Sequence, residues 1–351
     1  MIREYTLNET PIRTTNGYKM NNIKLDIDLP DINEFGNIDI ISDELDKFSI
    51  LVEKECKNSF KSRIGLDFDK YYKIKFIIPK NVVINKPIII KYKFDKYNSN
   101  LINKIYINLE ENSKADFILK YECVDEKVKA FYHLKQITNA SKNSKTKITI
   151  VNLLNEISDS FIAVENEVDK DAEVIHNIID LGGKNKISNY YSNLEGESGK
   201  NLVNNLYFGK NTDVIDMNYY IEIKGEKAEA NIEFQGAIKD YAKKSFKGTI
   251  DFIKGCTKSI GKENENCVIL SKTAKSKSLP MLLCHEDDVN GEHGVSSGKI
   301  DKEKLFYIMS KGISEKEAEK LIIKANFNKI INNINDEKIK NEIINIIENK
   351  I

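Results

Sequence analysis

Short runs of alternating apolar and polar residues fill the chain from about residue 70 to residue 290. Residues 73–77, 104–109, 146–150 and 231–234 alternate, whereas residues 87–92 are nearly all apolar. β-branched and aromatic residues dominate these runs, and Gly, Asn, Asp and Lys separate them. The pattern predicts a series of short strands that no long helix interrupts.

The predicted strands repeat about every 12–16 residues over roughly 200 residues, which is typical of a solenoid or of a large sandwich. Small residues precede several apolar runs, namely Ala115, Ala172 and Ala228, but no strict period is visible. The hydrophobic pattern alone therefore leaves both architectures open. A long β-solenoid would leave strands unpaired only at its two ends, and such ends need a cap or a partner.

Residues 1–69 form a predicted N-terminal region that is irregular and partly helical. Leu45, Phe48, Val52 and Cys56 share one helical face after Ser42, which is placed to cap the helix. Cys56 on that face is interpreted as a packed residue rather than a ligand, because buried free cysteines usually behave as small hydrophobic side chains.

Residues 299–351 are predicted to form a C-terminal helical domain. Asp301, Ser314 and Asp336 each precede a segment of helical period and are placed to cap it. Two apolar stripes follow the second and third caps: Ala318, Leu321, Ile322 and Ala325, then Ile339, Ile343, Ile346 and Ile347. These stripes either pack on each other and on the β body or form a docking surface for a partner.

The stretch from residue 280 to residue 313 joins the two patterns and holds two of the four His. Residues 280–284 suit a buried strand. Asn290-Gly291 and Gly294 favour a turn, which would place His293 in that turn. Imidazole is a good ligand for iron, so His293 is the histidine of most interest, although a structural role in the turn is the plain alternative.

The same stretch carries an ordered set of residues that resembles a known family. The set is Pro280, Leu282, Asp288, Val289, His293, Gly294, Gly298, Ile300, Asp301, Leu305, Phe306, Tyr307, Ser310, Gly312 and Ile313. This order resembles the C-terminal signature of the SufB/SufD family of iron–sulfur cluster assembly proteins, and residues 8–14 resemble its N-terminal N-x-x-P-x-(R/P)-T segment. Lys311 replaces the usual Arg, and Gly294 replaces a Glu of SufB-like members, which favours a SufD-like identity.

The resemblance implies a fold and a function. The fold is mainly β: a right-handed parallel β-helix over residues 70–298, with the N-terminal region before it and the C-terminal helical domain after it. The function is that of a scaffold subunit which pairs with a second SufB/SufD-family chain, or with itself, through the end of the β-helix. The C-terminal helices then bind the SufC ABC-type ATPase, with Leu305, Phe306, Tyr307, Leu321 and Ile322 as the expected contacts.

The resemblance also implies a transient iron–sulfur cluster at the subunit interface. His293 matches the family histidine implicated in building the cluster, and Glu292 occupies the position of an acid in SufB-like members. Cys267 aligns with the cysteine thought to bind the nascent cluster in SufB members, although it also suits a buried strand as a plain core residue. Cys284 is the next candidate thiolate, the usual ligand type for such clusters.

Composition limits the classes of protein to which this chain can belong. The chain has 351 residues, and its 54 basic and 54 acidic residues give a formal net charge of zero, which argues against a general nucleic-acid binder. No apolar run suits a signal peptide or a membrane span. The five Cys form no C-x-x-C pair, which predicts reduced thiols in the cytoplasm.

No phosphate-loop motif and no G-x-S-x-G elbow occur in the sequence. We therefore expect a non-enzymatic chain that binds no nucleotide, with ATP use left to a partner. Two alternatives stay open: a β-helix carbohydrate-active enzyme, against which the absence of Trp weighs, and a purely structural partner subunit without cluster ligands.

Overall fold

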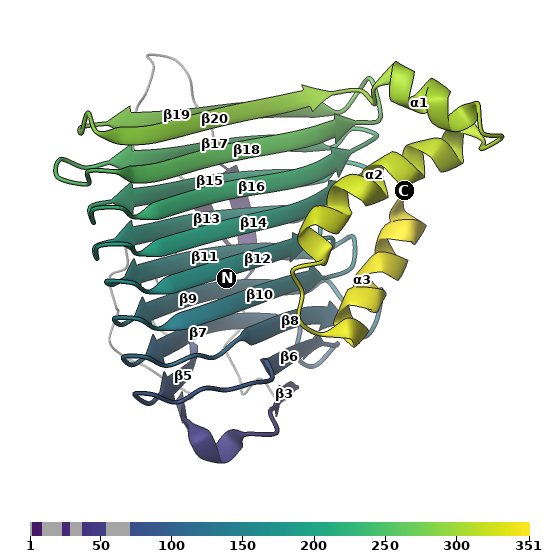
Figure 1. Cartoon of the computed structure of the whole chain (residues 1–351). Helices are drawn as coiled ribbons and strands as arrows, with labels where there is room; N and C mark the ends of the chain where they lie inside the picture. The colour runs from purple at the N-terminus through teal and green to yellow at the C-terminus, as the bar shows by residue number, and fades with distance from the viewer. Residues whose placement is uncertain (1, 9–22, 29–36, 54–70) are drawn as a thin grey trace.

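The computed structural model describes residues 2–8, 23–28, 37–53 and 71–351. From Tyr72 to Gly298 the chain alternates between two nine-stranded sheets. Each strand inside the stack pairs in parallel with the strands one coil before and one coil after it, whereas the strands of the first and last coils have a parallel neighbour on one side only. The predicted β-solenoid is therefore confirmed, and the sandwich alternative is excluded (Figure 1).

Sheet 1 is the sheet on which the helices pack. Its strands, in spatial order, are β20 (Val289–Gly298), β18 (Ser259–Ile269), β16 (Glu229–Ile238), β14 (Lys200–Gly209), β12 (Glu173–Asp180), β10 (Lys145–Leu153), β8 (Phe117–Cys123), β6 (Ile88–Phe94) and β3 (Ile38–Ile41).

Sheet 2 forms the opposite wall of the solenoid. Its strands, in spatial order, are β19 (Lys275–Cys284), β17 (Lys243–Phe252), β15 (Val214–Ile223), β13 (Asn185–Leu194), β11 (Asp159–Val168), β9 (Phe131–Ala140), β7 (Asn100–Leu109), β5 (Tyr72–Ile78) and β4 (Ser49–Glu53). Strands β3 and β4 pair antiparallel with β6 and β5, so they close the N-terminal end of both sheets.

The turns from sheet 2 to sheet 1, which we call corner 1, contain the coil period that the hydrophobic pattern conceals. All of them except the last, between β19 and β20, hold one non-glycine residue with positive φ, and these residues are spaced 27 to 31 residues apart: Asn81, Asn112, Asn143, Asp171, Ser198, Lys227 and Lys258. Asn and Asp tolerate this conformation better than most residues. Asn112 and Asn143 each donate a hydrogen bond to the asparagine one coil earlier, at 2.9 and 2.7 Å.

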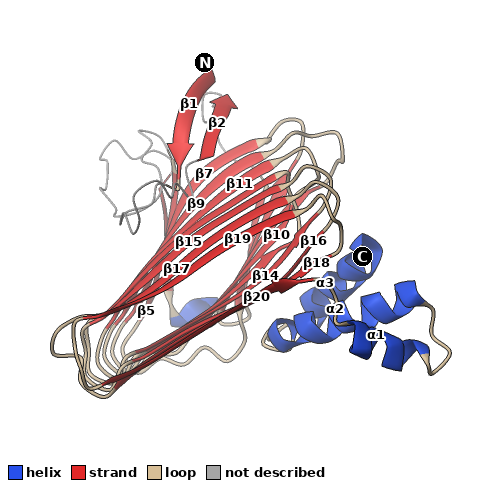
Figure 2. Ribbon diagram, turned by 90° about the horizontal axis from the view of Figure 1, so that it is seen from above, coloured by secondary structure: helices blue, strands red, loops and turns tan. Residues whose placement is uncertain are grey.

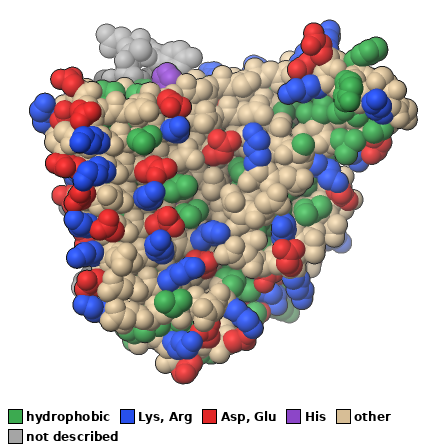
Figure 3. Space-filling model, viewed as in Figure 1, with side chains coloured by type: hydrophobic (Ala, Val, Ile, Leu, Met, Phe, Trp, Pro, Cys, Tyr) green, Lys and Arg blue, Asp and Glu red, His purple; other side chains and the backbone are tan. Residues whose placement is uncertain are grey.

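Charged residues also form ladders between neighbouring coils. Glu197 lies between Lys170 and Lys227, with N–O distances of 2.6 and 2.7 Å. Side chains of both signs alternate down the left edge of the molecule, where the corner 1 turns lie (Figure 3). Exposed pairs of this kind contribute little each, so the ladders mainly keep like charges apart on adjacent coils.

The C-terminal helices cover an apolar strip on the outer face of sheet 1 (Figure 2). They are α1 (Lys302–Met309), α2 (Glu315–Ile331) and α3 (Glu337–Lys350). Asp301, Ser314 and Asp336 each accept hydrogen bonds from backbone N–H groups of the first helical turn, so the three predicted caps are confirmed. In the described residues no helix is long and apolar enough to cross a membrane.

The two predicted helical stripes had different outcomes. Ile339, Ile343 and Ile347 of α3 are buried, as predicted. The α2 stripe was right at Ala318, which is buried, but wrong at Leu321 and Ala325, which are exposed. Ile323 and Phe327 pack on the sheet in their place. The outer face of sheet 1 selects the buried side of α2, and the helix periodicity does not contain that information.

The N-terminal region also departs from the prediction. Residues 42–53 form a short 3-10 turn (Leu45–Lys47) and strand β4 rather than a long helix, because β4 pairs with the edge of β5 that β7 leaves open. Cys56 and residues 9–14 lie outside the described residues. Strands β1 (Ile2–Leu7) and β2 (Ile23–Asp28) form an antiparallel pair. The buried side chain of Asn8 donates to the backbone oxygens of Ser188 and Asp216.

Candidate functional site

The last coil of the solenoid, formed by β19 and β20, is an open end. Each of these strands is the outermost strand of its sheet, and among the described residues no strand closes them as β3 and β4 close the other end. Every β20 residue after Val289 is exposed. In the view from above, β19 and β20 form the near end of the solenoid (Figure 2). Strand edges of this kind present free N–H and C=O groups to which another chain can pair.

His293 lies in the middle of β20, so the turn predicted at Asn290-Gly291 and Gly294 was wrong. Glycine weakens an isolated strand, but β18 supplies a continuous parallel ladder from Ser259 to Val268 that holds β20 extended. The long-range pairing overrides the local turn preference of the glycines.

The parallel register places His293 directly opposite Glu263 of β18. In-register parallel neighbours share a face of the sheet, and Glu263 is fully buried inside the coil. His293 therefore belongs to the inward-facing side of the open end. Glu292 belongs to the opposite face, where its carboxylate lies 3.4 Å from Lys262 Nζ, so the structure separates Glu292 from His293.

Glu263 is a buried acid that the sequence analysis missed. Neither of its carboxyl oxygens has a side-chain hydrogen-bond partner among the described residues. Burial, and then the charge of Glu265, raises the pKa of Glu263 to about 8. Gly248 makes the space for it, because a Cβ at that position would lie 1.9 Å from Glu263 Oε1. A neutral carboxyl group thus lies next to His293 at neutral pH.

We expect the wild-type chain to lose stability as the pH rises from about 5 to about 8, and the Glu263→Gln variant to lose much of this dependence. The folded state keeps a proton on Glu263 that the unfolded chain releases near the ordinary pKa of 4.5. The stabilisation of the folded state by this proton is complete below pH 4.5 and is lost as the pH rises through about 8, the raised pKa of Glu263. Urea unfolding at both pH values measures the difference, with Glu292→Gln as the exposed control; equal pH dependence in all three proteins would contradict the assignment.

Glu265, one inward-facing position further along β18, forms a buried ion pair with Lys244 of β17. The Tyr207 and Ser278 hydroxyl groups donate to Glu265 at 2.8 and 2.6 Å, and the Lys244 ammonium group also donates to Ser278 at 2.7 Å. Buried charges are tolerated when they are paired and hydrogen-bonded in this way. The network joins β14, β17, β18 and β19 just inside the open end.

Cys267 is also inside the coil and almost fully buried. It follows Glu263 by four residues, which is about 13 Å along a strand, so Cys267 and His293 of one chain do not meet at a single ion. Burial raises the pKa of the Cys267 thiol, beside the hydroxyl groups of Tyr207 and Ser276. A thiol must lose its proton to bind a metal, so Cys267 is not preactivated.

Cys284 ends β19 and is exposed at corner 1 of the open end. Burial, and then the charge of Glu286, raises the pKa of the nearby Cys256 thiol to about 11. The charge of Cys284 raises the pKa of Cys256 by a smaller amount. Within residues 2–8, 23–28, 37–53 and 71–351, no three His, Cys, Asp or Glu side chains are placed to hold a metal ion. The structure thus puts His293, Cys267 and Cys284 in the last two coils, but at three separate points.

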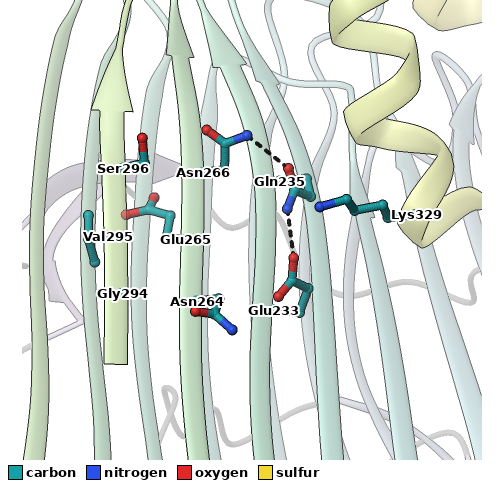
Figure 4. A pocket seen from close by; sticks show the side chains of 9 residues that line it. All are labelled: Glu233, Gln235, Asn264, Glu265, Asn266, Gly294, Val295, Ser296 and Lys329. Atoms are coloured by element: carbon teal, nitrogen blue, oxygen red, sulfur yellow. Dashed lines mark hydrogen bonds between the residues drawn. The ribbon is translucent and has the colours of Figure 1, made fainter. Parts of the chain in front are cut away.

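A polar groove of about 440 Å³ lies on the outer face of sheet 1, between β20 and α2 (Figure 4). The Gln235 amide donates to Glu233 at 2.6 Å, and Asn266 donates to Gln235 at 3.3 Å. Ser296 of β20 and Lys329 of α2 complete its two sides. The side chains of Glu233, Gln235 and Asn266 hydrogen-bond to one another. We therefore interpret the groove as a ladder of hydrogen-bonded side chains rather than an empty ligand site.

The expected partner-binding residues lie on α1 and α2. Phe306 and Tyr307 are 74% and 64% exposed, Leu321 is 45% exposed, and Leu305 and Ile322 are half-buried. Helix α1 contains no buried residue. Adjacent exposed aromatic side chains of this kind are typical of an interaction surface.

Comparison with known proteins connects this open-ended solenoid to a family. The pattern of the family described as SUF system FeS cluster assembly, SufBD core domain, matches residues 92–326. This chain belongs to the SufB/SufD family. The matched SufB/SufD span contains the open end, with His293 and Cys267, together with α1 and the first part of α2.

Individual SufB/SufD relatives agree with this assignment. The chain is 25% identical over 275 residues to the iron–sulfur cluster assembly protein SufD of Bacillus subtilis, covering 78% of this chain and 63% of that protein. It is 23% identical over 239 residues to SufD of Escherichia coli, covering 68% and 56%. A SufBD family protein of Methanocaldococcus jannaschii is 24% identical over 270 residues, covering 74% and 82%. The chain thus spans less than two thirds of both SufD proteins.

Proposed function

We propose that this chain is a non-catalytic scaffold subunit for iron–sulfur cluster assembly, which pairs through its open end with a second SufB/SufD-family chain. Membership of a cluster-assembly family supports the assembly role. The observation that carries the proposal is His293 on the inward-facing side of a terminal strand whose outer edge has no neighbouring strand among the described residues. A donor at such an edge is available to two chains at once.

The cluster would be cargo shared between two chains. Imidazole and thiolate are ligand types that suit iron, and His293 and Cys267 supply them, with Cys284 as the alternative thiolate. Donors of the described chain do not converge in groups of three, so the remaining ligands would come from the partner. A site completed only by pairing suits a scaffold, because a cluster held by four thiolates of one chain would be hard to hand on.

The second part of the proposal is that α1 and α2 hold the SufC ATPase. The exposed aromatic pair Phe306 and Tyr307 supports this assignment, since it lies within the family signature and outside the core. ATP-driven dimerisation of SufC would then shift the paired scaffold toward an arrangement that exposes the cluster.

We expect the His293→Ala variant to yield roughly tenfold less cluster than the wild type, because loss of a metal-site group typically costs about 10- to 100-fold in affinity. Anaerobic reconstitution of the paired complex, followed by visible absorbance and acid-labile sulfide, measures the yield. His285→Ala is the matched control, since His285 is an exposed histidine on the same coil that pairs with Asp251 at 3.4 Å.

Normal yield in His293→Ala would mean that this histidine has only a structural role, as in a purely structural partner subunit. Cys267→Ala and Cys284→Ala extend the experiment to the two thiols. Loss in the first variant alone assigns the thiolate to Cys267, and loss in the second alone assigns it to Cys284. Far-UV circular dichroism of each variant confirms that the solenoid is retained.

A further inference from the structure

The turns that lead from sheet 1 to sheet 2, which we call corner 2, enclose a pocket beside the end of α3. Residues of the β8–β9 turn and of the β10–β11 turn line it, together with Lys350, the last residue of α3. Its volume is about 750 Å³, within the range of about 300–1,000 Å³ that is typical of small-molecule sites. In sheet 1, β10 lies five strands from β20, or roughly 24 Å, so the pocket is separate from the open end.

Asn155 fixes the shape of the pocket. Its side-chain amide donates to three backbone oxygens of the β8–β9 turn, at 2.5 to 3.2 Å. Its side-chain oxygen accepts a hydrogen bond from the Ser158 hydroxyl group at 2.6 Å. These bonds hold two neighbouring turns together, so the pocket exists before any ligand enters it.

One wall of the pocket is apolar. Val124 and Ile157, on neighbouring coils, are 60% and 45% exposed, and Leu153 beside them is half-buried. The Cys123 thiol is also half-buried, and burial raises its pKa, so the thiol adds no charge at neutral pH. A ligand that covers this wall would remove apolar surface from water.

The Lys350 ammonium group, in contrast, has no acidic partner. The nearby acids are already taken, because Glu156 pairs with Lys210 and Asp213 pairs with Lys186 at 2.8 Å. Only the backbone oxygen of Lys350 is bonded within the described chain. Burial, and then the charges of Lys210 and Lys186, lowers the pKa of Lys350 to about 8. Three lysines thus share two acids, and one positive charge is left in the pocket.

We propose that this pocket binds a small organic carboxylate, whose charged end pairs with Lys350 and whose apolar chain covers Val124 and Ile157. A neutral ligand would leave the Lys350 charge unmatched, and an inorganic anion would leave the apolar wall in contact with water. Phosphate is usually bound by arginine or by several N–H groups at once, and no arginine is among the described lining residues. Glu126 and Glu156, at the same pocket, would also repel a second negative charge.

Binding there would tie α3 to the solenoid. Lys239, in the turn after β16, already donates to the backbone oxygen of Lys350 at 2.6 Å. A carboxylate held by the Lys350 side chain and by the walls of corner 2 would add a second connection between the last turn of α3 and the β body. The ligand would therefore stabilise the helical domain without taking part in cluster assembly.

Titration of the methyl-labelled full chain with hexanoate and butyrate at pH 7 tests the proposal, with chemical shifts read at Val124 and Ile157. We expect hexanoate to bind roughly tenfold more tightly than butyrate, because it buries two more CH₂ groups. Lys350→Met should weaken hexanoate binding by roughly tenfold or more, because it removes a charge-assisted hydrogen bond, and Lys350→Arg should retain most of the affinity. Val124→Asp should weaken binding as well, since it places a negative charge on the apolar wall.

The matched control is Lys338→Met, which removes an exposed lysine from the same helix and should bind hexanoate like the wild type. Far-UV circular dichroism checks that each variant is folded. Equal affinity of the wild type and a folded Lys350→Met variant would overturn the role of Lys350. Hexan-1-ol that binds as tightly as hexanoate, or inorganic phosphate that binds more tightly, would overturn the ligand class. Unchanged methyl shifts at millimolar hexanoate would overturn the site itself.

Discussion

Replacing Lys244 by methionine should lower the free energy of unfolding by about 3–5 kcal/mol, the usual cost of leaving one charge of a buried pair without its partner. Lys244 and Glu265 are both fully shielded from solvent, and the hydroxyl groups of Tyr207 and Ser278 are arranged around the charged pair. The methionine side chain fills similar space, so the loss reports mainly on the charge. Urea unfolding followed by far-UV circular dichroism suits this chain, which has no Trp.

The matched control for Lys244→Met is Lys262→Met, which removes a lysine from the exposed pair with Glu292 on the neighbouring strand. We expect that change to cost less than about 1 kcal/mol, as exposed pairs usually do. The double variant Lys244→Met with Glu265→Gln should recover part of the loss, because no unpaired charge remains buried. Equal effects of Lys244→Met and Lys262→Met would refute the buried network.

Changing Phe306 and Tyr307 together to serine should abolish co-purification with the SufC ATPase and leave the stability of the chain unchanged. Both side chains project from α1, which has no buried residue, so their removal costs the fold little. Aromatic residues at the centre of an interface commonly contribute about 2 kcal/mol or more each, so losing two would weaken binding by roughly 100-fold or more. Affinity capture with purified SufC and a thermal unfolding curve measure the two effects.

The matched control for this pair is Tyr241→Ser, which removes an aromatic residue that is also 64% exposed but lies in a turn of the solenoid. That variant should bind SufC normally. Deletion of residues 301–351 is a poorer test, because it uncovers the apolar strip of sheet 1 beneath α2 and α3. Full SufC binding by the Phe306 and Tyr307 double variant would move the docking surface away from α1.

The open end is the part of the molecule where the sequence was both most and least informative. Its ordered signature from Pro280 to Ile313 pointed to the correct family, which the match over residues 92–326 then established. The turn predicted in the same stretch was wrong, although Asn290, Gly291 and Gly294 are residue types that favour turns. Only the ladder with β18 shows that they are extended.

Glu263, the buried acid next to His293, could not be identified from the sequence for a related reason. Alternation in Lys-Glu-Asn-Glu-Asn-Cys does not say which set of side chains faces inward, since both sets are polar until Cys267. The sequence contained one signal for Glu263 and Glu265, which is a polar strand within a series of mostly apolar strands. Their partners Lys244 and Ser278 lie on other coils, so no spacing within β18 identifies them.

By itself the sequence determined the strands predicted between residues 73 and 234, the three helix caps and most of the α3 stripe, because each depends on residues that are close together in the chain. The tertiary structure decided the coil period, the strand at β20, the strand β4 in place of a helix, and the buried face of α2. The physical reason is common to all four. In a solenoid each strand is held by neighbours about one coil away, and the free energy of that long-range pairing exceeds the local preference of any single turn, glycine or apolar stripe.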